Sequence, residues 1–213
     1  MAGGSPVQIV LEDDPTPLVK ILGATLRRSA RNPALAAKLQ GMQGVVALKS
    51  STDPQAVTMR FDNGTVRLEH GVAADSGVVI AADLTKMNEP DAPKPKVTGA
   101  ARHLKLALAV SKVLEPPPGS WQEEARAFWQ FAHDHPRMPA AMLVVCTDDD
   151  ARLTLGAGAP EYELHGSGRA LISVFTGGSV LGEDLLNGKL QGVGSLQHLA
   201  ELTGRSLAWM FEG

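Results

Sequence analysis

The stretch GKLQGVGSLQHLAELTGRSLAWMFEG, residues 188–213, decides how the rest of the chain is interpreted. It predicts a short strand, a glycine turn and a long terminal helix. The same order occurs once earlier, in KVTGAARHLKLALAVSKVL at residues 96–114. At a constant offset, Lys189, Leu190, Gly192, Leu199 and Ala200 match Lys96, Val97, Gly99, Leu106 and Ala107. This repetition predicts a duplicated structural unit.

Length and composition agree with two units and exclude some classes of partner. The chain has 213 residues, which fits two domains of about 100 residues each. A net charge of -3 and the lack of any Lys/Arg run argue against nucleic-acid binding. Cys146 is the only cysteine, so an internal disulfide is excluded and a reducing compartment is favoured. No apolar run is long enough for an integral membrane segment, and no signal peptide is evident, so we expect a soluble, cytoplasmic protein.

The first unit is predicted to open with helices and to continue as a sheet. After a leader of small residues, Thr16-Pro17 and Asn32-Pro33 each combine a cap with a first-turn proline, so two helices are expected. Residues 57–61 and 65–70 alternate around Asn63-Gly64, which predicts a hairpin with a two-residue turn. With residues 44–50 and 77–82 as neighbouring strands, a four-stranded antiparallel meander is expected. The proline-rich residues 87–95, MNEPDAPKP, are expected to form a loop.

The second unit is predicted to repeat this plan. Ser120 and Glu123 form a capping box, and the helix that follows places Trp121, Ala125, Phe128 and Ala132 on one face. Strands are expected at residues 141–147, 151–156 and 162–166, followed by two short helices. Ser179 is the expected cap of the second short helix, and Gly188 is its expected terminator. The predicted fold class is therefore α+β, with two related units, each a mainly antiparallel sheet of four to five strands covered by helices.

The terminal helix is apolar on two sides. One face carries Leu196, Leu199, Ala200, Leu207, Met210 and Phe211, and a second stripe carries Leu202 and Trp209. One side should cover the sheet. The other is expected to face the partner unit, another subunit or a ligand.

The order of elements and several phrases resemble the sterol carrier protein family. In the first unit, DNGTVRLEHG (62–71) and DSGVVIAADLT (75–85) are similar to the central hairpin, next strand and helix start of that family. In the second unit, residues 170–202 are similar to its two short helices, returning strand and last helix. RLTLGAGAP (152–160) also resembles the C-terminal domains of actinobacterial mycothiol-dependent isomerases. The resemblance implies two tandem units, each a sheet covered by helices.

The resemblance also implies a ligand, and the proline run at residues 116–118 predicts where the two units divide. Residues 1–115 are expected to form the first unit, residues 116–119 a proline-rich linker, and residues 120–213 the second unit. In the first unit, MNEPDAPKP stands in place of the short ligand-binding helices of the family. A lipid, sterol or acyl chain would bind in a hydrophobic cavity between the helices and sheet of the second unit. The expected cavity residues are Leu171, Val174, Phe175, Leu181, Leu185, Leu199, Leu202 and Trp209. Apolar stripes of this kind also form closed cores, which is the alternative.

No residue pattern supports a catalytic, metal or cofactor site. Residues 148–150 are three aspartates that could hold a cation, but aspartates are ordinary turn residues. His133 and His135 lie at a helix end before Pro136, and Cys146 lies in an apolar strand, where a thiol is usually inert. The short glycine patterns at 166–168 and 192–194 are interpreted as turns, because neither continues into a nucleotide-binding signature.

Three functions remain open at this point. The first is non-catalytic binding or carriage of an apolar small molecule in the second unit. The second is an accessory or dimerisation module with collapsed cavities, in which the outer stripe of the terminal helix makes a protein interface, for example in a homodimer. The third is an enzyme with a mycothiol-linked or acyl-transfer role, which would need a titratable cluster that the sequence does not reveal.

Overall fold

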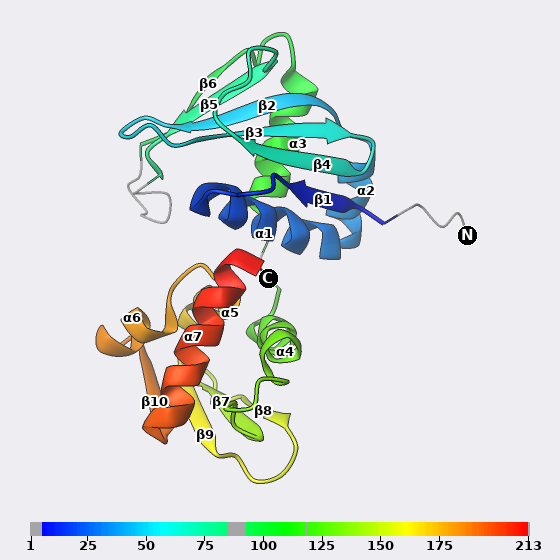
Figure 1. Ribbon diagram of the computed structural model, residues 1–213. Helices are drawn as coiled ribbons and strands as arrows, with labels where there is room; N and C mark the ends of the chain where they lie inside the picture. The colour runs from blue at the N-terminus through cyan, green and yellow to red at the C-terminus, as the bar shows by residue number, and fades with distance from the viewer. Residues whose placement is uncertain (1–5, 85–92, 118, 213) are drawn as a thin grey trace, which may run out of the picture. The chain divides into compact units, whose positions relative to one another are not determined.

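The computed structural model describes residues 6–84, 93–117 and 119–212 of the chain. It divides into two compact units, Met1–Pro116 and Pro117–Gly213 (Figure 1). Each unit contains a β-sheet covered by helices, with six strands in the first sheet and four in the second. The predicted α+β class is confirmed.

The two N-terminal helices begin where the cap signals place them. Helix α1 covers Pro17–Arg31, and the Thr16 hydroxyl accepts the Val19 N–H at 3.5 Å. Helix α2 covers Pro33–Gln40, and the Asn32 side chain accepts the Ala34 N–H at 3.0 Å. Each cap satisfies a backbone donor that the first helical turn leaves without a partner. Both predicted helices are confirmed.

The predicted hairpin is also confirmed, and it forms the middle of the first sheet. Strands β3 (Ala56–Asp62) and β4 (Thr65–His70) pair antiparallel around Asn63 and Gly64. The φ angles of these two turn residues are 44° and 96°, the left-handed region that a tight hairpin turn requires. The other strands are β1 (Gln8–Leu11), β2 (Gln43–Ser50), β5 (Val78–Ala82) and β6 (Lys96–Thr98), and the order across the sheet is β1-β4-β3-β2-β5-β6.

The expected four-stranded antiparallel meander is wrong in two respects. Strand β5 pairs with β2 in parallel, so the sheet is mixed, and the leader contains strand β1, which pairs in parallel with β4. The Gln8 N–H donates to the Gly64 carbonyl at 2.8 Å, and the Glu12 N–H donates to the Leu68 carbonyl at 3.1 Å. Pairing between strands so distant in sequence has no local signature, so the alternation of residues did not reveal it.

The first unit ends with a strand and a helix, as expected. After β6, the helix α3 covers Leu104–Leu114, so it starts five residues after Gly99 and not directly after it. Its C-terminal end is joined to α1 by the buried Ser29 hydroxyl, which donates to the Val113 carbonyl at 2.6 Å. The proposed loop at 87–95 lies mostly outside the described residues; residues 93–95 have no regular structure.

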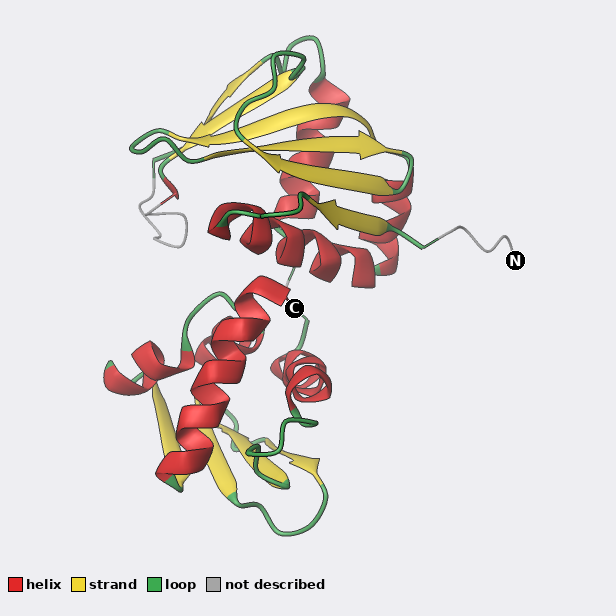
Figure 2. Ribbon diagram, in the orientation of Figure 1, coloured by secondary structure: helices red, strands yellow, loops and turns green. Residues whose placement is uncertain are grey.

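Helices α1, α2 and α3 pack on one face of the first sheet (Figure 2). Their apolar side chains form one buried core with those of β2, β3 and β4. Leu26, Leu39, Met59 and Leu68 are among the fully buried members. The first unit therefore has a filled core of its own.

The second unit has the elements that the sequence predicted. Its elements are α4 (Trp121–Ala132), β7 (Ala141–Cys146), β8 (Arg152–Gly156), β9 (Tyr162–Gly166), α5 (Gly168–Phe175), α6 (Leu181–Leu186), β10 (Leu190–Gly194) and α7 (Leu196–Glu212). The strand order is β10-β9-β7-β8, with β7 and β9 parallel and the other pairs antiparallel. The capping box of Ser120 and Glu123 is present at the start of α4.

Two local predictions in the second unit are wrong. Val180, without a side-chain bond, stands at the cap of α6, whereas the Ser179 hydroxyl donates to Asp184. Gly192 and Gly194 lie inside strand β10 and not in a turn. A Cβ atom at either glycine would overlap the ring of Tyr162 on the paired strand β9, so these glycines provide space for that ring.

Candidate functional site

The candidate site is the layer between the helices and the sheet of the second unit. Side chains from α4, α5, α6, α7, β7 and β9 meet there around a cavity of about 10 Å³. Its lining residues are Phe128, Met142, Leu164, Val174, Phe175, Leu181, Leu202 and Ser206. A volume of that size holds about one water molecule. In this conformation the layer is therefore an almost completely filled apolar core.

The structure places the eight predicted cavity residues at three depths. Val174, Phe175, Leu181 and Leu202 line the cavity. Leu171 and Trp209 are buried in the same core without lining it. Leu185 and Leu199 are partly buried and pack against the edge of the core. All eight belong to one cluster, but only half of them surround the space.

Sequence reasoning missed four lining residues. Phe128 was assigned to the inner face of α4, but not to the site, and Met142 and Leu164 face inward from the central strands β7 and β9. Their burial follows from the position of these strands in the middle of the sheet, which the sequence did not reveal. No sequence pattern indicated that Ser206 lines the cavity, because serines are mostly exposed on helices of soluble proteins.

The inner face of α7 carries Leu202, Ser206 and Trp209, which are all buried. Leu196 is 82% exposed and Leu207 is 45% exposed, so these members of the longer predicted stripe face away from the core, whereas Leu199 packs against its edge. Of the two stripes, the shorter one containing Trp209 covers the sheet side.

Trp209 fixes α7 against α5 and α4. Its indole Nε1 donates to the Phe175 carbonyl at 2.6 Å, which satisfies a carbonyl near the C-terminal end of α5. Its ring packs against Phe131, with ring centroids 5.1 Å apart, and against Phe128 at 6.3 Å. These contacts close one end of the apolar layer.

Ser206 is the polar member of the cavity wall. The residue is 1% exposed, and within the described part of the chain its hydroxyl has no hydrogen-bond partner. A buried hydroxyl without a partner costs about 1–3 kcal/mol of stability. The cavity therefore combines an apolar wall with one hydroxyl able to donate or accept a hydrogen bond.

The α6 segment is held at its inner side by Asp184. Its carboxylate accepts a hydrogen bond from the Ser179 hydroxyl and lies 3.2 Å from the Lys189 Nζ, although the residue is only 2% exposed. The Lys189 N–H also donates to the Asp184 carbonyl at 2.9 Å. Gly177 and Gly188, both with positive φ, mark the two ends of the segment. Its attachment thus combines the apolar contact of Leu181 with the ion pair of a buried carboxylate.

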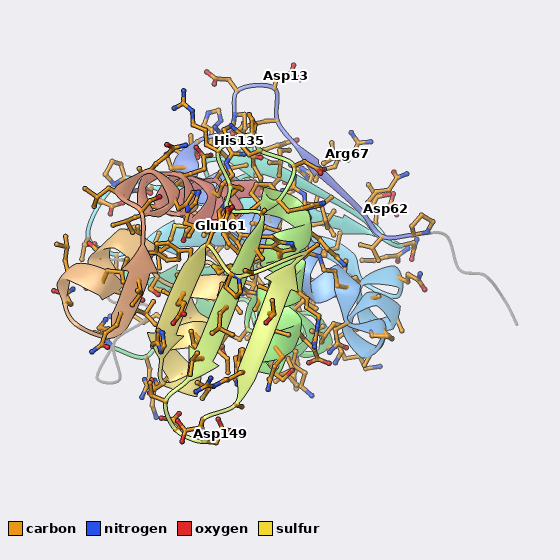
Figure 3. All side chains as sticks on the ribbon, turned by 90° about the horizontal axis from the view of Figure 1, so that it is seen from below. Asp13, Asp62, Arg67, His135, Asp149 and Glu161 are labelled. Atoms are coloured by element: carbon orange, nitrogen blue, oxygen red, sulfur yellow. The ribbon has the colours of Figure 1, made fainter. Side chains whose placement is uncertain are left out.

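Residues considered for chemistry have structural roles. Burial raises the pKa of the Cys146 thiol, which keeps it protonated near neutral pH. Asp148 accepts the Gly168 N–H at 2.8 Å, and Asp149 accepts the Ala151 N–H at 3.1 Å. Figure 3 shows Asp149 and His135 at opposite ends of the second sheet. His135 lies 2.7 Å from the Glu201 carboxylate.

Among the described residues, no group of three or more His, Cys, Asp or Glu side chains is arranged to hold a metal ion. In that same part of the chain, no helix is long and apolar enough to cross a bilayer.

No protein-family model matches the chain, and no curated protein matches it either. Several solved structures are similar to it, and two of them illustrate the likeness. One is the solution structure of a conserved hypothetical protein from Thermus thermophilus, described as possibly a sterol carrier protein; it is 19% identical, covers 49% of this chain and 92% of its own, and has a TM-score of 0.32. The other, a UbiJ-SCP2 ubiquinone synthesis protein, is 12% identical, covers 94% of this chain and 98% of its own, and has a TM-score of 0.27.

The first of these descriptions names, as a possibility, the family that the sequence resembles. With TM-scores of this size, function has to be inferred from the geometry of the chain itself.

Proposed function

We propose that the second unit binds an apolar small molecule, a lipid, sterol or acyl chain, between its helices and its sheet. The observation that carries this proposal is the cavity in an apolar core whose wall contains the unpartnered hydroxyl of Ser206. Burial of apolar ligand surface would drive binding, at about 25 cal/mol per Å² removed from water. A hydrogen bond from the ligand would satisfy Ser206, which gives binding a second favourable contribution.

The ligand must enlarge the cavity to enter. Pockets for small molecules usually measure about 300–1,000 Å³, far more than the volume enclosed here. The α6 segment is the best candidate for the part that moves, because it is short and contributes a single lining residue, Leu181. Its outward displacement would open the space between α5 and α7 while leaving the sheet intact.

The chemistry of the wall favours a ligand with an uncharged polar group. The described lining residues include no Lys, Arg or His, so a carboxylate or phosphate would be buried without a counter-ion. A hydroxyl, ketone or ester oxygen can bond with Ser206 at no such cost. We therefore expect sterols and long-chain alcohols or esters to bind better than ionised fatty acids.

Leu181→Trp should block this binding. The larger side chain enters the cavity from α6 and occupies the space that a ligand would take. Titration with a fluorescent sterol analogue, together with native mass spectrometry for a retained ligand, measures the loss, which we expect to be at least about tenfold in affinity.

Leu186→Trp is the matched control. This residue lies on the same helix and is 89% exposed, so the same substitution leaves the cavity unchanged and binding should persist. No binding of any sterol, alcohol, ester or fatty acid by the unmodified protein contradicts the proposal. So does equal binding by the two variants.

Ser206→Ala should separate stability from binding. In the ligand-free protein the change removes a buried hydroxyl without a partner, so the free energy of unfolding should rise by about 1 kcal/mol. Affinity for a ligand that bonds with this hydroxyl should fall by roughly tenfold, the equivalent of about one such bond. Urea unfolding followed by tryptophan fluorescence gives the first quantity, and the sterol titration gives the second. A loss of stability with unchanged affinity would contradict the assigned role of Ser206.

A protein interface is the second candidate, and exposed apolar side chains around β10 favour it. Leu186 at the end of α6, Val193 on β10 and Leu196 at the start of α7 are all more than half exposed. Exposed apolar patches often mark contacts between proteins. A homodimer formed through them would appear in sedimentation velocity as a shift from the monomer mass to twice that mass as the protein concentration rises. A monomer at all concentrations would contradict the homodimer.

A further inference from the structure

An open groove lies in the first unit between α2, the start of β2 and the first half of α3. Its volume is about 760 Å³, within the range of small-molecule pockets. The lining residues are Ala37, Lys38, Gly41, Met42, Gln43, Ala101, Arg102, His103, Leu104, Lys105, Leu106 and Ala109. The proposed function of the second unit does not involve any of them.

The charged side chains of this groove are all basic. Lys38 comes from α2, whereas Arg102 and Lys105 come from the turn before α3 and from its first helical turn. No acidic residue is among the described lining residues, and none of the three cations forms an ion pair with another described residue. Every lysine of the chain except Lys189 lies in the first unit. The groove is therefore a site of unpaired positive charge.

Apolar side chains lie beside these cations. Met42 is buried, and Leu106 packs so closely on Gly44 of β2 that a Cβ atom at that glycine would lie 2.6 Å from the leucine Cδ2. Leu104 stands on the first turn of α3 and is 58% exposed. One wall can therefore hold a hydrocarbon chain, while the basic side chains hold a charged group.

His103 marks the start of α3 at the groove. The His103 imidazole lies against Gly77, where a Cβ atom would be 3.1 Å from the ring Nε2. His103 is the N-cap of α3, but its side chain makes no capping hydrogen bond. The N–H groups of the first turn of α3 are therefore not bonded by the His103 side chain. The positive end of the helix dipole adds to the field of the three cations.

We propose that this groove binds a small anionic amphiphile, with a carboxylate or phosphate group at Arg102, Lys105 and Lys38 and its hydrocarbon chain against Leu104, Leu106 and Met42. Charge complementarity supports the anion, and the apolar wall supports the chain. The groove volume of about 760 Å³ lies in the range of small-molecule sites, which favours a single bound molecule over a flat bilayer surface. This ligand differs from the uncharged ligand of the second unit.

The test uses the full chain labelled with nitrogen-15 and dodecyl phosphate below its micelle concentration. Amide shifts should change at Ala37–Gln43 and at residues 101–106, and the titration gives the affinity. Arg102→Gln combined with Lys105→Gln should weaken binding by at least about tenfold, because two charge-assisted contacts are removed. Lys49→Gln combined with Lys112→Gln is the control, since both lysines are exposed and lie outside the groove, and should change affinity by less than about twofold.

Further ligands distinguish the parts of the proposal. Inorganic phosphate should bind at least about tenfold more weakly than dodecyl phosphate, because it lacks the chain. Dodecyltrimethylammonium should cause no shifts in the groove. Equal binding of inorganic phosphate, equal binding of the cationic amphiphile, or equal weakening by the control pair would each overturn the proposal. Binding only to vesicles of anionic phospholipid, with none to the single amphiphile, would also overturn it in favour of a membrane-contact surface.

Discussion

Trp209→Ala is expected to lower the free energy of unfolding of the second unit by about 4 kcal/mol. The change removes a buried indole that packs on Phe128 and Phe131, and it leaves the Phe175 carbonyl without the indole N–H that it accepts at 2.6 Å. Because α7 covers the sheet mainly through this face, loss of the indole should loosen the whole helix.

Tryptophan fluorescence measures this effect selectively. The other two tryptophans, Trp121 and Trp129, also lie in the second unit, so the signal of the variant still reports only on that unit during urea unfolding. Leu207→Ala on the same helix is the control, since Leu207 is half-exposed and should cost less than about 1 kcal/mol. Similar losses for the two variants would show that α7 is not anchored through Trp209.

Gly156→Ala is expected to destabilise the second unit by about 3 kcal/mol. Gly156 ends strand β8 with a φ of 86°, a conformation that costs a residue with a side chain about 1–3 kcal/mol. The added methyl group would also overlap the Ala140 carbonyl oxygen and would lie 2.8 Å from the Trp129 ring. The Ala140 carbonyl directly precedes the paired strand β7 and accepts the Ala157 N–H at 3.2 Å. It cannot move aside without weakening that bond, so the overlap adds a comparable cost.

Gly158→Ala separates the cost of the backbone conformation from the cost of the steric overlap. Gly158 lies two residues further along the same connection and also has a positive φ, 98°, but nothing lies within 4 Å of a Cβ atom there. It should therefore cost about 1–2 kcal/mol, from backbone conformation alone. Urea unfolding of both variants gives the difference. Equal losses would show that the close contacts of Ala140 and Trp129 with Gly156 contribute nothing.

The Trp209 experiment also bears on the proposed ligand. A ligand between α5 and α7 has to enlarge a core that the Trp209 contacts and the α6 ion pair hold closed. Binding of the expected sterol or alcohol should then raise the stability of the second unit in proportion to the logarithm of ligand concentration. Dodecyl phosphate bound in the groove of the first unit should cause no such rise, because all three tryptophans lie in the second unit.

The sequence determined the local structure of this protein. The caps at Thr16, Asn32 and Ser120 and the hairpin turn at Asn63 depend on interactions between residues a few positions apart, so local patterns were sufficient to locate them. The same reasoning placed the helices and strands of the second unit. The family resemblance added the prediction that Phe175, Leu181 and Leu202 lie together, and all three belong to one apolar cluster.

Only the tertiary structure decided how these elements pair and which faces they bury. The position of β1 beside β4, the parallel pairing of β2 with β5 and the inward face of α7 depend on contacts between distant residues, which no short pattern encodes. Packing also reduced the expected cavity to about 10 Å³ and placed Ser206 in its wall. Whether apolar side chains enclose a space or fill it depends on their combined volume and geometry in three dimensions, and the sequence by itself does not contain that information in readable form.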